Sequence, residues 1–246
     1  MHRFFGPSFT PGDETVILPR DEAEHLTRVL RLTSGDTVAV FDGRGHECLA
    51  RVLSTQGREV RVQVLSRVEP AAEPAVSLTL VQAVLKGEKM DDIVRDAVML
   101  GVVAIHPIVT RCTETTVAAL VKGARPDLWR RIALAAVKQS RRATLPEIRT
   151  PLSFEDFLEE PPPALRLMLI EPAASTTVEP ISALGGHRRP SDAAVLVGPE
   201  GGWTDEECTA ARAHDVRLVT LGHRTLRADA VPVAAISVLQ FLWEDL

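Results

Sequence analysis

The residues of this chain best suited to chemistry lie in segment 195–207, which reads Val-Leu-Val-Gly-Pro-Glu-Gly-Gly-Trp-Thr-Asp-Glu-Glu. An apolar strand is expected to end at the glycine-rich run 198–202. A helix is expected to begin at Thr204, because Glu207 three residues later completes a capping box. Glycine leaves the backbone bare, so the chain can approach a ligand closely and adopt positive φ angles. The arrangement predicts a small-molecule pocket at the carboxyl end of a strand.

Two further segments combine an apolar strand with a corner. Residues 169–172 end a strand in Glu-Pro, and residues 221–230 pass from Leu-Gly into the start of a helix. A helix N-terminus offers free N–H groups, although Asp229 could serve there only as a cap. The glycine spacing in 198–202 fits neither a dinucleotide fingerprint nor a phosphate loop. A tight strand-to-helix turn is the plainer alternative for that run.

A polar stretch bounded by prolines, 69–74, divides the chain into two predicted domains. Residues 1–70 are β-rich and alternate apolar with polar side chains, as in a half-buried antiparallel meander, with one helix over 21–32. The expected strands of this domain cover 39–41, 46–53 and 59–68.

Residues 75–246 alternate short apolar strands with helices, which predicts an α/β domain with a mostly parallel sheet. The expected strands cover 76–81, 102–109, 164–170, 193–197 and 217–221. The expected helices cover 88–100, 127–141 and 229–243. Each of the three corners follows one of these strands.

The net charge is −5, yet 24 of the 28 basic residues are arginines. Arginine binds phosphate in a bidentate manner, and an acidic total does not exclude a local basic surface. On the helix expected over 127–141, a basic stripe is predicted from spacings of seven and four residues, with a solvated helix face as the alternative. The stripe consists of Arg131, Lys138 and Arg142, and Arg20, Arg28 and Arg31 of the first domain could extend it.

The three cysteines, Cys48, Cys112 and Cys208, are odd in number and far apart, so neither a disulfide framework nor a zinc pattern fits them. They are expected to be buried thiols in a reducing cytoplasm. The seven histidines show no metal-binding spacing, and no metal is expected. No apolar run approaches the roughly 18 residues of a membrane span, so no membrane partner is expected.

Taken together, these motifs resemble the SPOUT methyltransferases, and specifically the bacterial 16S ribosomal RNA (uracil-N3) methyltransferases. The family pattern hydrophobic-Gly-Pro-Glu-Gly-Gly-aromatic-Ser/Thr-x-x-Glu matches residues 197–207, and its Leu-Gly-x-Arg and Leu-Arg pairs match within 221–227. The segment 86–90 is similar to the family's Lys-Gly-Asp-Arg-Met, and residues 1–5 and 25–31 are similar to the opening of its PUA-like domain. The resemblance spans essentially the whole chain.

This chain departs from the family pattern at a few positions. Where the family has Thr-Glu-Thr-Ala after the Leu-Arg pair, residues 228–231 read Ala-Asp-Ala-Val, so the carboxylate is shortened and a threonine is lost. Lys138 and Met99 replace two common glutamates. The corners are expected to act largely through backbone, so these departures leave the implied cofactor loops intact.

The resemblance implies a fold and a cofactor. The fold is α/β: a C-terminal SPOUT domain with a deep trefoil knot follows a small PUA-like, RNA-binding β-barrel. The cofactor is S-adenosyl-L-methionine, held by the knot loops, and a second subunit completes the site in a homodimer. The implied cofactor-binding residues are Leu169, Ile170, Glu171, Pro172, Val197, Gly198, Pro199, Glu200, Gly201, Gly202, Leu221, Gly222, Leu226, Arg227 and Ala228.

The implied reaction is methylation of N3 of one uridine in 16S ribosomal RNA or the 30S subunit. Arg227 could stabilise negative charge on the uracil carbonyl oxygens, and Asp229 and Glu200 are candidate general bases. A 2′-O methyltransferase of another SPOUT branch is one alternative, although its Asn-x-Gly-x-x-x-Arg pattern is not found after residue 76. A non-catalytic RNA-binding assembly factor is the other.

Overall fold

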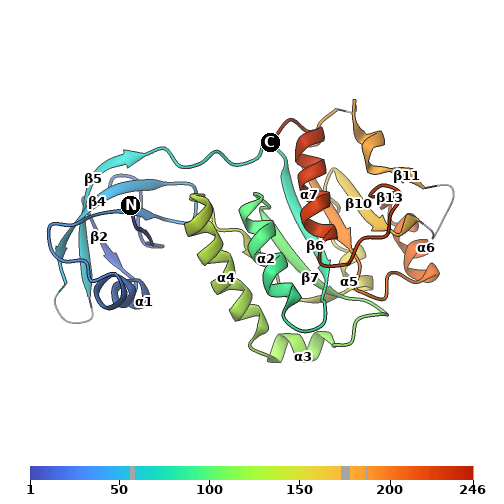
Figure 1. Cartoon of the computed structure of the whole chain (residues 1–246), viewed down its shortest axis with the longest axis horizontal. Helices are drawn as coiled ribbons and strands as arrows, with labels where there is room; N and C mark the ends of the chain where they lie inside the picture. The colour runs from blue at the N-terminus through green and yellow to red at the C-terminus, as the bar shows by residue number, and fades with distance from the viewer. Residues whose placement is uncertain (56–58, 173–177, 187, 246) are drawn as a thin grey trace. The chain divides into compact units, whose positions relative to one another are not determined.

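The computed structural model describes residues 1–55, 59–172, 178–186 and 188–245 (Figure 1). The chain divides into two compact units. The first consists of Met1–Glu73 and Val137–Leu145, and the second of Pro74–Ala136 and Pro146–Leu246. The sequence placed one domain over 1–70 and the other over 75–246. The structure therefore differs in one respect, because a segment from the middle of the chain returns to the first unit.

A five-stranded sheet forms the first unit, in the order β1-β3-β4-β5-β2. The antiparallel meander predicted for this part of the chain is confirmed in β3, β4 and β5. Two short strands were not predicted: β1 pairs parallel with β3, and β2 pairs antiparallel with β5. The strands are β1 (Arg3–Phe5), β2 (Thr15–Leu18), β3 (Thr37–Phe41), β4 (Glu47–Ser54) and β5 (Val60–Val68).

The helix predicted over 21–32 is shorter and changes type along its length. It runs as α1 (Arg20–Glu24) and then as a π-helix, η1 (His25–Val29), in which the N–H of Leu30 donates to His25 O. Arg31 then takes a positive φ of 55° and ends the helical segment. Apolar periodicity locates a helix but does not reveal a widened turn, so the π-helix could not be predicted.

A buried arginine makes several of the bonds that hold the returning segment to the first unit. Arg3 donates to the carbonyls of Val137, Lys138 and Arg142 at 2.8 to 3.0 Å, and it pairs with Glu47 at 2.8 Å. Its side chain is only 9% exposed. These bonds satisfy carbonyls at and just beyond the end of a helix, and they help to hold the segment in the first unit.

The second unit contains an all-parallel sheet in the order β11-β13-β10-β12-β6-β7-β8, with β9 also paired to β7. The predicted parallel α/β arrangement is therefore confirmed. The short edge strands β8, β9 and β11 were not predicted. The strands are β6 (Ser77–Ala83), β7 (Ala104–Val109), β8 (Glu147–Ile148), β9 (Leu152–Ser153), β10 (Leu165–Ile170), β11 (Glu179–Pro180), β12 (Asp192–Val197) and β13 (Arg217–Thr220).

Helices cover both faces of this sheet. α5 and α6 share a buried core with one face, in which Met168 and Leu196 pack among phenylalanines of α5. α2 and α7 lie side by side on the sheet (Figure 1). The helices are α2 (Lys89–Met99), α3 (Val117–Lys122), α4 (Arg125–Ser140), α5 (Phe154–Leu158), the 3-10 helix η3 (Ile181–Leu184), α6 (Asp205–Ala213) and α7 (Val231–Leu242).

Because the sheet is parallel, the carboxyl ends of its central strands meet at one edge. β10 lies between β12 and β13, and β12 also pairs with β6. The segments that follow β10, β12 and β13 are the three corners identified in the sequence. The fold therefore brings these corners together, as expected for ligand sites in α/β sheets.

Candidate active site

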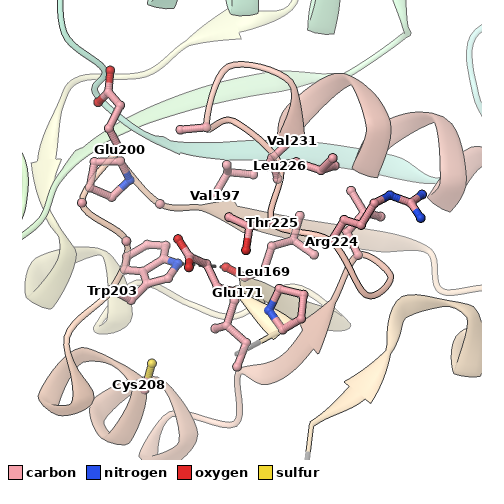
Figure 2. Close-up of a pocket in the computed structure, with 18 residues that line it drawn as sticks. Leu169, Glu171, Val197, Glu200, Trp203, Cys208, Arg224, Thr225, Leu226 and Val231 are labelled. Atoms are coloured by element: carbon pink, nitrogen blue, oxygen red, sulfur yellow. Dashed lines mark hydrogen bonds between the residues drawn. The ribbon is translucent and has the colours of Figure 1, made fainter. Parts of the chain in front are cut away.

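A cavity of about 250 Å³ opens at the carboxyl ends of β10, β12 and β13 (Figure 2). All three corners contribute to its wall: the first corner (residues 169–172) lies at the end of β10, the second (198–202) follows β12 and the third (221–230) follows β13. Its lining residues are Leu169, Ile170, Glu171, Pro172, Val197, Gly198, Pro199, Glu200, Gly201, Gly202, Trp203, Cys208, Leu221, Arg224, Thr225, Leu226, Ala228 and Val231. Gly222 and Arg227 were predicted to bind the cofactor but do not line the cavity. Trp203, Cys208, Arg224, Thr225 and Val231 line it without having been predicted.

The glycines of the second corner are required by close contacts. A Cβ at Gly198 would lie 2.9 Å from Nε1 of Trp203, and one at Gly201 would lie 2.9 Å from Cβ of Cys112. Gly202 adopts a φ of +70°, which side chains other than hydrogen rarely allow. The run 198–202 is therefore shaped by its neighbours, and its bare backbone forms part of the cavity wall.

Trp203 joins two corners directly. Its indole N–H donates to the carbonyl of Leu169 at 2.9 Å, and its ring packs against Phe154 at 5.1 Å between centroids. The same ring lies against Gly198. The aromatic position in the sequence motif was the signal for this residue, but only the structure shows that Trp203 sets the spacing of the first and second corners.

A capping box fixes the chain beyond Trp203. Thr204 accepts from the N–H of Glu207, and Glu207 accepts from the N–H of Thr204 at 2.9 Å, as predicted. Glu207 is 3% exposed, and it also accepts from the N–H of Arg111 at 2.9 Å. This one carboxylate therefore ties the start of α6 to the segment after β7.

The Glu200 side chain points away from the floor of the cavity (Figure 2). Its Oε1 accepts from Nζ of Lys89 at 2.7 Å and from the N–H of Lys86 at 3.4 Å. Burial raises the pKa of Glu200. The hydrogen bond and charge of Lys89, together with backbone N–H groups, lower this pKa by more than burial raises it, so the net shift is downward. A carboxylate engaged in this way is a weak proton acceptor, which argues against Glu200 as a general base.

Arg227 and Asp229 form a two-bond ion pair at the third corner. Nε of Arg227 donates to Oδ1 of Asp229 at 3.1 Å, and its NH2 group donates to Oδ2 at 2.8 Å. The hydrogen bond from Arg227 lowers the pKa of Asp229. The Arg227 side chain is 77% exposed. Asp229 does not cap α7, because the N-cap is Ala230 and makes no side-chain bond.

Cys208 is the cysteine whose side chain lines the cavity. Burial raises the pKa of the Cys208 thiol, which keeps it protonated. Cys112 and Cys208 are partly exposed, so the prediction of a buried thiol is correct for Cys48 alone. Among the described residues, no group of three or more His, Cys, Asp or Glu side chains could hold a metal ion.

The predicted basic stripe on α4 is wrong at its C-terminal end. α4 ends at Ser140, and Arg141 takes a φ of 65°, so Arg142 lies beyond the helix. Arg142 is 4% exposed and pairs with Glu73. Lys138 is 25% exposed and pairs with Glu22, which is buried. Both cations are therefore committed to pairs within the first unit, and neither presents a free charged surface.

The other predicted basic residues are exposed. Arg20 and Arg28 both reach Glu24, at 3.1 and 4.0 Å, while their side chains remain 65% and 74% exposed. Arg31, the left-handed residue that ends the helical segment, is exposed. Arg131 is exposed on α4 and belongs to the second unit.

The fold and the cavity define an α/β protein with a pocket of small-molecule size where three strand-end corners meet. Residues 72–240 match the family model of an RNA methyltransferase domain, and residues 18–65 match that of an RNA methyltransferase PUA domain. The chain therefore belongs to the RNA methyltransferase family, with a PUA-like first unit.

Named relatives extend over nearly the whole chain. It is 33% identical to a ribosomal RNA small subunit methyltransferase E from Synechocystis, over 95% of this chain and 75% of the relative. It is 32% identical to the protein of the same name from Mycobacterium bovis, over 98% of this chain and 93% of that one.

Solved structures agree with the sequence comparison. The ribosomal RNA small subunit methyltransferase E of Neisseria gonorrhoeae, bound to S-adenosyl methionine, superposes with a TM-score of 0.86 at 32% identity and covers 99% of this chain and 98% of its own. A Legionella pneumophila methyltransferase in complex with the cofactor SAM gives a TM-score of 0.86 at 28% identity, over 97% and 96% of the two chains. The predicted fold class, an α/β SPOUT domain after a PUA-like domain, is confirmed.

Proposed function

We propose that this chain transfers a methyl group from S-adenosyl-L-methionine to N3 of a uridine in 16S ribosomal RNA. The observation that carries the proposal is the cavity formed by the three corners. It lies in a fold shared over nearly its whole length with a relative bound to S-adenosyl methionine. The relatives from Synechocystis and Mycobacterium bovis are named as ribosomal RNA methyltransferases. The choice of uridine N3 comes from the sequence resemblance.

The residues present fit such a cofactor. The cavity combines bare backbone at Gly198 and Gly201, where a side chain would collide, with apolar walls from Leu169, Val197 and Leu226. Backbone N–H and C=O groups and apolar surface are the usual means of holding a nucleoside. When bound, S-adenosyl-L-methionine supplies a methyl group that is already activated by the adjoining sulfonium.

The chain's own residues then have to orient the target base and manage its charge. Positioning of the reactants supplies much of the rate enhancement in such a transfer. Uracil N3 must lose a proton, and negative charge develops on the carbonyl oxygens. Arg227 is the residue proposed to stabilise that charge. Asp229 and Glu200 are weak bases because their pKa values are lowered, so we propose that the proton leaves to water.

RNA binding is proposed for the exposed arginines Arg20, Arg28 and Arg31 of the first unit, together with Arg131 of the second. Contacts of this kind hold phosphates and position RNA without reading its sequence. Lys138 and Arg142 are left out because each is already paired within the chain. Since N3 is blocked in paired RNA, the target uridine should be unpaired or flipped out of its helix.

Joint replacement of Arg28 and Arg31 with alanine tests the RNA surface. RNA affinity is expected to fall, and the slope of log K against log salt is expected to shrink by roughly one per lost phosphate contact. Filter binding of 16S RNA between low and moderate salt measures both quantities. Arg61→Ala is the matched control, because Arg61 is exposed on β5 of the same unit and pairs with Glu59. An unchanged salt slope in the double variant would remove these residues from the interface.

Loss of the Trp203 hydrogen bond should weaken cofactor binding. Trp203→Phe keeps the ring packing but leaves the Leu169 carbonyl without its donor, so the affinity for S-adenosyl-L-methionine is expected to fall about five- to tenfold. Trp129→Phe is the matched control, because it removes a similar bond, from Nε1 to Asp91 at 3.0 Å, at a residue that does not line the cavity. Equal affinities in the two variants would contradict the role given to Trp203.

A homodimer is also proposed, with α7 as a candidate contact because Phe241 is 73% exposed on it. A ribosomal RNA substrate would place the chain in the cytoplasm, where its cysteines would stay reduced. Among the described residues, no helix has the length and apolar character needed to cross a membrane.

Two experiments distinguish this proposal from its alternatives. Calorimetry with S-adenosyl-L-methionine tests whether the chain binds the cofactor; absence of binding at millimolar concentration would favour a non-catalytic assembly factor. Transfer of labelled methyl to 30S subunits tests catalysis. Alkaline hydrolysis of the labelled RNA then separates base methylation from 2′-O methylation, because a 2′-O-methyl group blocks cleavage of the adjoining phosphodiester bond.

A further inference from the structure

A fourth corner reaches the cavity loop from the neighbouring strand. β6 pairs with β12 in parallel, so the two strands end at the same edge of the sheet. After β6 the chain turns through Gly87, with a φ of +68°, and α2 begins at Lys89. The sequence resemblance included segment 86–90 but gave it no role.

An ion pair and a backbone hydrogen bond join the two corners. Nζ of Lys89 lies 2.7 Å from Oε1 of Glu200, and the N–H of Lys86 donates to the same oxygen at 3.4 Å. The two side chains are 37% and 26% exposed. The charge of Lys89 also contributes to the lowered pKa of Asp229 in the third corner. Lys89 therefore acts electrostatically on two of the segments that surround the cavity.

The ion pairs of Arg95, another cation of α2, differ in what they join. Arg95 pairs with Asp92 and Asp96 of its own helix, which adds nothing to the position of another segment. Lys89 instead joins residues 111 positions apart in sequence. The loop to which it is tied contains three glycines and would otherwise lose much backbone entropy when it orders around a ligand.

We propose that Lys89 is a positioning residue for the methyl donor: through Glu200 it holds residues 198–202 in the conformation that lines the cavity. The identity of the ligand rests on the proposed function. A loop fixed before the ligand arrives lowers the cost of binding, so the pair contributes to affinity although neither charge is needed to touch the ligand. The function of Glu200 is thereby that of an anchor rather than a base.

Calorimetry with S-adenosyl-L-methionine on the full chain tests this proposal. Lys89→Met is expected to raise the Kd about fivefold, the upper range for a partly exposed ion pair. Glu200→Gln removes the carboxylate charge but keeps an oxygen that can accept from Nζ of Lys89, so its Kd should rise by a smaller factor. The double variant should bind no more weakly than Lys89→Met alone, because that substitution has already removed the ion pair. Lys89→Arg should restore the Kd to within about twofold, as expected for a retained charge at hydrogen-bond distance.

Arg95→Met is the matched control, because it removes a cation of α2 whose pairs stay within the helix, and its Kd should equal that of the unchanged chain. The kcat at saturating cofactor should be unchanged in Lys89→Met, which separates positioning from catalysis. Thermal unfolding identifies any variant that fails to fold. If Lys89→Met does not fold, Glu200→Gln tests the same ion pair.

Three results would overturn the inference: an unchanged Kd in both single variants, additive effects in the double variant, or an equal effect of Arg95→Met. Failure of the unchanged chain to bind the cofactor would instead contradict the proposed function. The two failures are therefore distinguishable in one set of titrations.

Discussion

Replacement of Arg227 with alanine is expected to lower kcat for methyl transfer by about 100- to 1,000-fold, as does the loss of one group that stabilises developing charge. Arg227 does not line the cavity, and its guanidinium is bound to Asp229 at 2.8 and 3.1 Å. The Kd for S-adenosyl-L-methionine should therefore stay nearly constant. Single-turnover assays with 30S subunits, together with calorimetry, measure the two quantities.

Arg212→Ala is a suitable control for Arg227, because Arg212 is an exposed arginine of α6 in the same unit. Its kcat should equal that of the unchanged chain. Asp229→Asn adds a second comparison, since it weakens the pair that orients Arg227 without removing the guanidinium. If Arg227→Ala retained full methylation of 30S subunits, the role given to Arg227 would be wrong.

Gly198→Ala is expected to weaken cofactor binding by about tenfold or more, as overpacking costs about 1–3 kcal/mol. The new Cβ would lie 2.9 Å from Nε1 and 3.0 Å from Cε2 of Trp203. That indole is held by the Leu169 carbonyl and by Phe154, so relief of the collision must displace the first corner or the second. Calorimetry with S-adenosyl-L-methionine measures the loss.

Gly35→Ala provides the control for Gly198→Ala. Gly35 lies in the first unit with a φ of +98° and has open space around it, so alanine there brings backbone strain without a collision or a change at the cavity. Its stability should fall while its cofactor affinity stays the same. Unchanged affinity in Gly198→Ala would show that the second corner tolerates displacement and does not shape the site.

The architecture of the second unit could be predicted because its signals are local. Apolar runs of strand length alternate with helical periods, and Thr204 with Glu207 marks a helix start that the structure confirms. Two- to four-residue strands such as β1, β2 and β8 contain too few residues for a pattern to emerge. The prediction of a trefoil knot came only from family resemblance, because knots are nearly absent from proteins and no residue pattern indicates one.

The contacts between corners could not be predicted because they join residues far apart in sequence. Glu200 was taken as a candidate base, but its partner Lys89 lies on a helix that precedes it by more than a hundred residues. Trp203 was recognised as part of a motif, whereas its bond to Leu169 depends on the order of strands in the sheet. Backbone-shaped corners were therefore easier to find than the side chains that hold them.

The partners of the basic residues could not be predicted from the sequence either. Helical spacing grouped Arg142 with Lys138, but the left-handed residue Arg141 ends that segment, and both cations are used inside the first unit. Arg3 helps to hold the segment that contains both cations in the first unit, since it donates to backbone carbonyls of that segment. A charge pattern in sequence does not reveal which cations already have an internal partner.

We propose that the cavity at the three corners serves methylation of uracil N3. Nucleoside mass spectrometry of 16S RNA, after incubation of 30S subunits with the chain and S-adenosyl-L-methionine, identifies the product. We expect 3-methyluridine, formed by the unchanged chain and nearly lost in Arg227→Ala. A 2′-O-methylated nucleoside, or no methylated product despite cofactor binding, would contradict it.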